Sequence, residues 1–194
     1  MTDGVLSGRE TIGVPVALRL AVAEDLPALE WYGLFTHHRE VIASAFRMQR
    51  QGTGAMLLAD VNGFPAGQVW IDFARKRHAG IATLWAVRVF DPFRGLSLGS
   101  RLMRAAERLV AGRGVPDAEL GVDRDNPGVL RFYERLGYAR AGEETGTFRY
   151  RRPDGETVEV AIDQWLLRKR VIGAARIAKA ARAGTATRTL TPRP

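Results

Sequence analysis

The chain of 194 residues is 46% hydrophobic and 26% charged, a composition typical of one soluble globular domain with a substantial core. The absence of cysteine excludes a disulfide framework, a thiolate metal site and a cysteine nucleophile. No apolar run approaches the roughly 20 residues of a membrane span, and the N-terminal residues lack the pattern of a signal peptide. We therefore expect a cytoplasmic protein without a membrane span.

The net charge of +8 comes from the C-terminal end. Residues 168–194 hold eight of the 29 Lys and Arg residues and no acid, which leaves 21 basic against 21 acidic residues in 1–167. We expect a flexible N-terminal arm at 1–15, one domain at 16–167, and a basic tail at 168–194 that is partly helical and then disordered. Because the tail has no aromatic residue, any polyanion binding by it should be weak, non-specific and salt-dependent.

The N-terminal half alternates between short apolar runs and turn residues. Acidic residues and Pro27 follow the first run, which is typical of the first turn of a helix. Asn62 and Gly63 separate two later apolar runs, and this dipeptide is a strong signal for a tight hairpin turn. The expected elements are a strand at 16–22, a helix from 24 to 33, a helix at 37–51, and strands at 55–61 and 68–74.

The stretch 84–114 predicts a strand, a glycine-bearing loop and a long helix. Residues 84–90 are rich in β-branched and aromatic side chains and end at an Asp-Pro pair. From Leu98, apolar residues recur with the 3.6-residue period of a helix that ends at two glycines. Small residues in 94–100 let the backbone approach a ligand closely, and the helix N-terminus favours an anion. Arg94 adds a charge suited to phosphate.

The C-terminal half predicts a strand, a capped helix and further strands. Asn126 is suited to cap a helix that starts at Pro127, and Gly137 to end it in the left-handed conformation. The expected elements are a strand at 118–122, a helix from 127, strands at 138–141 and 147–151, a turn at 153–155 and a last strand at 157–166. The whole order indicates a single α/β (α+β) domain with a mixed twisted sheet of about seven strands and helices on both faces.

Two segments resemble the cofactor motifs of the GCN5-related N-acetyltransferase (GNAT) family. The first motif, Arg/Gln-x-x-Gly-x-Gly/Ala after a valine-bearing strand, is matched by Arg94 and Gly99 after Val87 and Val89. Ser97 stands where the family usually has its first glycine. The second motif is matched by Asn126, Phe132, Tyr133, Gly137 and Tyr138. The motifs cover 84–138, and the order of elements extends the resemblance over most of the chain.

The resemblance implies that the two central strands splay apart and that the pantetheine arm of acetyl-CoA lies between them. The loop after the first of these strands would wrap the pyrophosphate. The cofactor-binding residues implied are Val87, Val89, Arg94, Gly95, Ser97, Leu98, Gly99, Ser100, Asn126 and Tyr133. Val87 and Val89 also suit a core, and Asn126 suits helix capping alone, so ordinary structural roles are open to them.

The resemblance also implies transfer of acetyl from acetyl-CoA to a primary amine of a small molecule or peptide by direct attack. Tyr133 is expected to protonate the leaving thiolate, although packing as a half-buried tyrosine is open to it. Some members carry a glutamate where this chain has Gly121. Glu119 and Asp123 share its face by alternation, so either could serve as the base, and Asp72 is a further candidate. Catalysis through ordered water, with no dedicated base, is an equal alternative.

A non-catalytic acyl-CoA-binding sensor or regulatory module is the alternative function, motivated by Ser97 and by the missing glutamate. We expect no metal, because His37 and His38 have no third ligand at a suitable spacing. A homodimer is implied by the resemblance alone. The aromatic residues expected near the acceptor cleft are Trp31, Tyr32, Phe35, Trp70 and Trp85.

Overall fold

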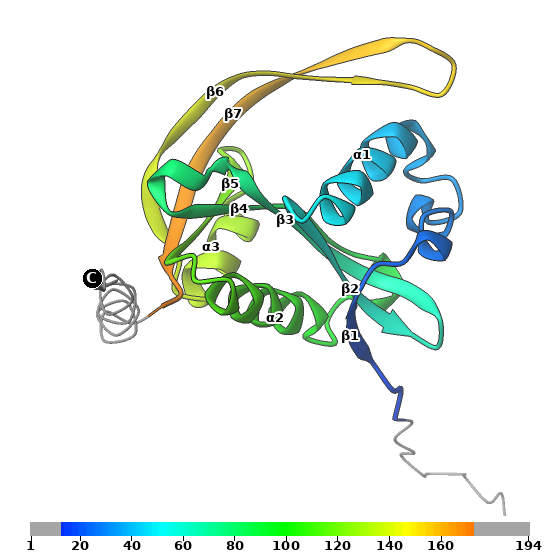
Figure 1. Cartoon of the computed structure of the whole chain (residues 1–194), viewed down its shortest axis with the longest axis horizontal. Coiled ribbons are helices and arrows are strands. Elements are labelled where there is room, and N and C mark those ends of the chain that lie inside the picture. The colour runs from blue at the N-terminus through cyan, green and yellow to red at the C-terminus, as the bar shows by residue number, and fades with distance from the viewer. Residues whose placement is uncertain (1–12, 173–194) are drawn as a thin grey trace, which may run out of the picture.

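A computed structural model describes residues 13–172 and places them in one seven-stranded mixed sheet with helices on both faces (Figure 1). The strand order is β1-β2-β3-β4-β5-β7-β6, as the sequence predicts for a mixed sheet of about seven strands. The strands are β1 Ala17–Leu20, β2 Gly54–Val61, β3 Phe64–Lys76, β4 Ile81–Val89, β5 Asp117–Asp123, β6 Ala139–Arg151 and β7 Thr157–Arg170. The α-helices are α1 Arg39–Arg50, α2 Leu98–Gly112 and α3 Pro127–Arg135.

The helices divide the core into two layers. Leu102, Met103, Ala106 and Val110 are the fully buried side chains of α2, and their i, i+4 spacing turns one apolar stripe onto the sheet. On the opposite face, Ile42 and Ala45 of α1 pack with Met56, Leu58 and Trp70. Alternating residues of β2 therefore serve different layers, which fixes the register of this strand. In residues 13–172, no helix is long and apolar enough to cross a membrane.

The prediction of a helix from 24 to 33 is wrong. Only two short 3-10 turns form there, Ala23–Asp25 and Ala28–Glu30, and Trp31 then turns left-handed at φ +45°. The Asp25 carboxylate accepts from the backbone N–H of Val22 and pairs with Arg19, so the first turn is tied to β1. The indole of Trp31 donates to the carbonyl of Pro65 at 2.8 Å. These tertiary anchors outweigh the local preference for a helix.

The prediction of a hairpin at 138–151 is also wrong, because β6 runs unbroken from Ala139 to Arg151. It pairs with β7 along its length, with one register shift between Arg140 and Gly142. The glycines at 142 and 146 lie within the strand, the first at this bulge and the second at φ +154°. The turn lies only between Arg151 and Thr157, so the hairpin is long. Residues 144–163, named here the β6–β7 arm, extend beyond the part of β7 that pairs with β5 and curve over the α1 face (Figure 1).

The domain also extends beyond its expected end at residue 167. Arg168, Lys169 and Arg170 lie in β7 and pair with acids of the body, Glu119, Glu107 and Asp117 respectively. Assigning these three charges to the tail was wrong, because sequence charge alone does not reveal the acids that neutralise them. Ile172 is buried as well. The rest of the expected tail, and residues 1–12 of the expected arm, lie outside the described residues.

Candidate active site

The sheet opens between β4 and β5, as the resemblance implies. These strands pair in parallel only at Ile81↔Asp117, Ala82↔Ala118 and Thr83↔Glu119. Beyond Thr83 they separate around a hollow of about 210 Å³, named here the strand gap. It is lined by Leu84, Trp85, Ala86, Val87, Leu120, Gly121, Val122, Asp123, Asn126, Val129, Tyr133 and Gln164. The facing edges of β4 and β5 are thus free to receive an extended ligand chain.

A bulge in β4 sets which side chains face each side of the sheet. Between the pairs Gln68↔Arg88 and Trp70↔Trp85, β4 holds one residue more than β3, and Ala86 lies there at φ +49°. The extra residue reverses the order in which the following side chains of β4 alternate between the two faces of the sheet. Trp85 and Ala86 both pack on the α1 side, whereas Val87 turns to the α2 side. Arg88 consequently faces the α1 side instead of the core beneath α2.

The loop between β4 and α2 offers unpaired backbone donors. The first loop-to-helix hydrogen bond runs from the N–H of Arg101 to the carbonyl of Ser97 at 3.1 Å. The N–H groups of Leu98, Gly99 and Ser100 have no acceptor among the described residues. Ser97 is the N-cap at φ +60°, and its side chain makes no capping bond. These donors and the positive end of the α2 dipole form a backbone site for an anion.

Two more of the expected cofactor residues, Gly95 and Arg94, lie around this loop. Gly95, at φ +80°, adopts a conformation that favours glycine. A Cβ on Gly99 would lie 3.4 Å from the Phe132 ring, so α2 and α3 approach closely there. Arg94 is exposed and pairs with Asp91 at 2.9 Å. Its guanidinium stays at the surface, where an exposed ion pair is weak and readily exchanged for another anion.

Helix α3 brings Tyr133 and Asn126 to the strand gap, as expected. Asn126 caps α3 by accepting from the N–H of Val129 at 3.1 Å, and it lines the gap as well. Tyr133 is only 6% exposed, and its burial raises the pKa of the phenol to about 12. Its hydroxyl therefore stays protonated at neutral pH and remains a proton donor toward the gap.

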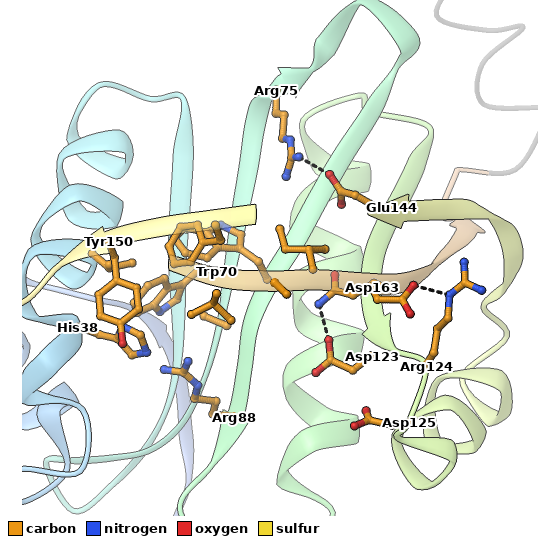
Figure 2. A pocket seen from close by; sticks show the side chains of 18 residues that line it. His38, Trp70, Arg75, Arg88, Asp123, Arg124, Asp125, Glu144, Tyr150 and Asp163 are labelled. Carbon is orange, nitrogen blue, oxygen red and sulfur yellow. Dashed lines mark hydrogen bonds and ion pairs between the residues drawn. The ribbon is translucent and has the colours of Figure 1, made fainter. Parts of the chain in front are cut away.

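A larger hollow of about 810 Å³, named here the cleft, lies on the α1 side of the sheet (Figure 2). Its floor includes Trp70 and Trp85, two of the five aromatic residues that the sequence predicts near an acceptor cleft, and they pack edge to face at 4.8 Å. The β6–β7 arm forms the opposite wall and reaches α1 through Tyr150, whose ring lies 4.6 Å from that of His38. Trp31, Tyr32 and Phe35 do not line the cleft, because Trp31 and Tyr32 pack against Phe90 and Phe35 packs against Trp31.

The cleft and the strand gap meet at the end of β5. Four residues line both hollows: Trp85, Ala86, Asp123 and Gln164. The amide of Gln164 donates to the Asp123 carboxylate at 2.7 Å, across the β5–β7 pair. The same side chain covers Gly121, since a Cβ built there would lie 2.0 Å from Oε1 of Gln164. The neutral amide of Gln164 thus fills the space next to Gly121. Gly121 is the position at which some family members are expected to carry a glutamate.

Glu119 does not join this site. It is 1% exposed, lines neither hollow, and pairs with Lys76 and Arg168. Although its burial acts in the opposite direction, the two cations hold the pKa of Glu119 below its usual value. A low pKa and two fixed partners suit a structural ion cluster better than a proton acceptor. Asp72 also has a local role, because it accepts from the N–H groups of Ala74 and Arg75.

The cleft residues that sequence reasoning missed include His38, Arg88, Tyr150 and Gln164. Arg88 depends on the bulge, and Tyr150 and Gln164 on the pairing of a strand distant in sequence, so no local motif marks them. His38 was considered only as a metal ligand. Among the described residues, no group of three or more acids and histidines could hold a metal ion.

Comparisons with known proteins agree on the fold. An N-acetyltransferase from Staphylococcus aureus Mu50 matches with a TM-score of 0.64 at 15% identity, over 81% of this chain and 99% of that one. PaiA N-acetyltransferase from Thermoplasma acidophilum, solved in complex with coenzyme A, has a TM-score of 0.62 at 15% identity, over 80% of this chain and 99% of that one. An uncharacterised N-acetyltransferase of Methanocaldococcus jannaschii is 34% identical over 96 residues. That match spans 47% of this chain and only 41% of the relative.

The mixed sheet of this chain, which opens between the parallel strands β4 and β5, thus has an overall fold similar to that of solved N-acetyltransferases. The family model gives the same result at the level of sequence, because the acetyltransferase (GNAT) family matches residues 21–138. The chain belongs to this family.

Proposed function

We propose that this protein is an N-acetyltransferase that moves the acetyl group of acetyl-CoA to a primary amine of a small molecule or peptide. The observation that carries the proposal is the meeting of the two hollows at Asp123 and Gln164. An amine in the cleft would lie next to an acyl group in the strand gap. Family membership and the coenzyme A complex of the PaiA structure support the same activity.

The residues around the strand gap suit acetyl-CoA. The unpaired N–H groups of Leu98, Gly99 and Ser100 would bind the pyrophosphate, with Arg94 as an additional cation. The free edge of β4 at Val87 and Val89 would hydrogen-bond the pantetheine amides. The side chains of both valines pack against the core, and this leaves their backbone groups available to a ligand. Core packing and main-chain binding of the cofactor are therefore compatible roles.

The chemistry we propose is direct attack. The amine nitrogen would bond to the thioester carbonyl carbon as the carbon–sulfur bond breaks, and the protein would supply mainly proximity. Tyr133 would donate its phenolic proton to the departing thiolate, because the pKa of about 12 keeps that proton available. Asp123, directly or through a water, would take the proton from the amine or hold it in place.

Two variants at one position test the cofactor site. Ser100→Glu places a carboxylate in the first turn of α2, where the helix dipole favours it, yet where it would repel a pyrophosphate. We expect calorimetry to show acetyl-CoA binding at least about 10-fold weaker, with no loss of thermal stability. Ser100→Gln is the matched control, with the same shape but no charge. Equal binding by both variants would contradict the proposed pyrophosphate site.

Turnover tests the activity itself. A thiol-detecting assay across a broad amine panel should show coenzyme A release above background with some amines. The neutral amide of Gln164 at Gly121, where a carboxylate is absent, favours one other function, a non-catalytic acyl-CoA-binding module. Tight acetyl-CoA binding without release of thiol for any amine would support that module and contradict the transferase.

A further inference from the structure

Charge pairing in the cleft leaves one arginine alone. Arg75 pairs with Glu144 at 2.6 Å, and Arg124 pairs with Asp163 at 2.7 Å. Arg88 is the third arginine of the cleft, and its guanidinium makes no ion pair or hydrogen bond to any residue in 13–172. It lies over the Phe35 ring at 4.1 Å. That contact uses one face of the guanidinium and leaves its N–H edges free.

An unpaired cation at this position is expected to lower the stability of the fold. Arg88 is half-buried, and desolvation lowers the pKa of its guanidinium from the usual value. A partly buried charge without a partner destabilises a fold unless something else compensates for it. Moreover, Arg88 faces the cleft only because of the bulge at Ala86, a non-glycine residue at positive φ. Strain of this kind, combined with an unpaired charge in a hollow, is typical of a binding site.

The surroundings of Arg88 define the charge of its partner. The guanidinium points toward the side of the cleft where His38 and Tyr150 lie (Figure 2). Nδ1 of His38 is buried there without a hydrogen-bond partner among the described residues. The unpaired acids of the cleft, Asp123 and Asp125, come from the end of β5 and the turn that follows it (Figure 2). The cleft therefore has a cationic side and an acidic side that borders the strand gap.

We propose that Arg88 is the binding site for a carboxylate of the acceptor, which is therefore an amino-carboxylic acid. Its amine lies at Asp123, beside the strand gap, and its carboxylate at Arg88. The apolar side chains between, chiefly Trp70 and Trp85, contact its hydrocarbon or aryl body. The guanidinium fork can pair with two oxygens of either a carboxylate or a phosphate, but the single positive charge of Arg88 balances a carboxylate and would leave a phosphate dianion partly unneutralised. This inference rests on the proposed function and adds the class of acceptor.

Matched pairs of amines test the inference. Each pair is an amino acid and its neutral primary amide, taken from α-amino acids with apolar side chains and from ω-amino acids of increasing length. Wild-type protein should use the acid of at least one pair with a kcat/KM about 10-fold or more above that of its amide. Arg88→Gln should bring this ratio to about 1, while Arg88→Lys should keep part of it. Arg75→Gln is the matched control, since Arg75 already pairs with Glu144, and it should keep the preference.

Calorimetry with the coenzyme A-loaded protein separates failure of this inference from failure of the transferase. If no amine is acetylated but the acids bind to wild-type protein and not to Arg88→Gln, the carboxylate site stands and the transferase fails. If amines are acetylated but acids and amides are used equally, the transferase stands and the carboxylate site is wrong. The site is equally overturned if the preference survives Arg88→Gln, if Arg75→Gln removes it as fully, or if there is neither turnover nor acid binding.

Discussion

Arg168 donates two hydrogen bonds to Oε2 of Glu119, at 2.7 and 3.0 Å, across the β5–β7 pair. Lys76 of β3 binds the other carboxylate oxygen. Because Glu119 is almost fully buried, this cluster joins three strands through a charge that water does not reach. It stabilises the sheet at the end where β4 and β5 still pair, next to the point where they separate.

Removing Glu119 should destabilise the fold rather than alter the chemistry. Glu119→Ala leaves Lys76 and Arg168 without an acid, and we expect a loss of about 3–5 kcal/mol in the free energy of unfolding, measured with urea. The control is Glu156→Ala in the exposed pair with Arg152, which should cost about 1 kcal/mol or less. A folded, stable Glu119→Ala protein without turnover would instead restore Glu119 as a base.

The conformation of Ser97 predicts the effect of the glycine that the family usually carries there. At φ +60° a serine is strained by about 1–2 kcal/mol, whereas the entropic cost of glycine is about 0.5–1 kcal/mol. Ser97→Gly should therefore stabilise the protein by about 0.5 kcal/mol and leave acetyl-CoA binding intact or tighter. Ser100→Gly, inside α2, is the matched control and should lose about 0.5 kcal/mol. Equal losses in urea unfolding would argue against strain at Ser97.

Tyr133→Phe should separate binding from turnover. Loss of the phenolic proton should lower kcat about 100-fold, while acetyl-CoA affinity stays close to wild type because the ring still fills the strand gap. Since burial raises the pKa of Tyr133 to about 12, this group should cause no break in the pH–rate profile below about pH 11. Tyr138→Phe is the control, a buried neighbour at 5.9 Å that lines neither hollow. Unchanged kcat in Tyr133→Phe would assign the tyrosine to packing alone.

The sequence predicted well those features that depend on local chemistry. Asn126, Pro127 and Gly137 define the ends of α3 through capping, a fixed φ and a left-handed glycine, none of which needs tertiary contacts. The opening of the sheet was predicted by resemblance. Residues whose position depends on strand register could not be predicted. Ala86 carries no local signal for a bulge, and the direction of Arg88 follows from that bulge.

The same limit applies to the C-terminal strand. Gln164 reaches Asp123 only because β7 inserts between β5 and β6, an arrangement that joins residues 41 positions apart. Distant partners also explain why one run of basic residues was assigned to the wrong part of the chain. Arg168 and its two neighbours read as part of a solvated tail, yet each has an acidic partner from a distant element.

His38 should make stability fall in mild acid. Burial first, and then the nearby His37 and Arg88, lower the pKa of His38 from 6.5 to about 4. Between pH 6.5 and pH 4 the unfolded chain binds more protons at this residue than the folded chain. The stabilisation from His38 is therefore full above pH 6.5 and is lost as the pH falls toward 4. His38→Gln should lose less thermal stability from pH 7 to pH 5 than wild type, and His78→Gln, in an exposed turn, should match wild type. Identical losses in all three proteins would refute this effect.

The end of β7 predicts where the chain can be shortened. Ile172 is buried, and the N–H of Val171 donates to the carbonyl of Pro116, so the domain includes both residues. Deleting 173–194 should leave acetyl-CoA binding and the melting temperature nearly unchanged. It should also remove any weak, salt-dependent binding to polyanions, because this segment carries five Lys and Arg residues and no acid.

Deleting 168–194 is the matched comparison, and it should unfold the protein. This cut removes Arg168 and Lys169, which leaves the buried Glu119 with Lys76 alone and Glu107 without a cation. Circular dichroism melts and calorimetric titration of both truncations with acetyl-CoA provide the measurement. If the shorter deletion also unfolds the protein or abolishes binding, residues 173–194 belong to the folded domain or to the cleft, and the proposal of a dispensable tail is wrong.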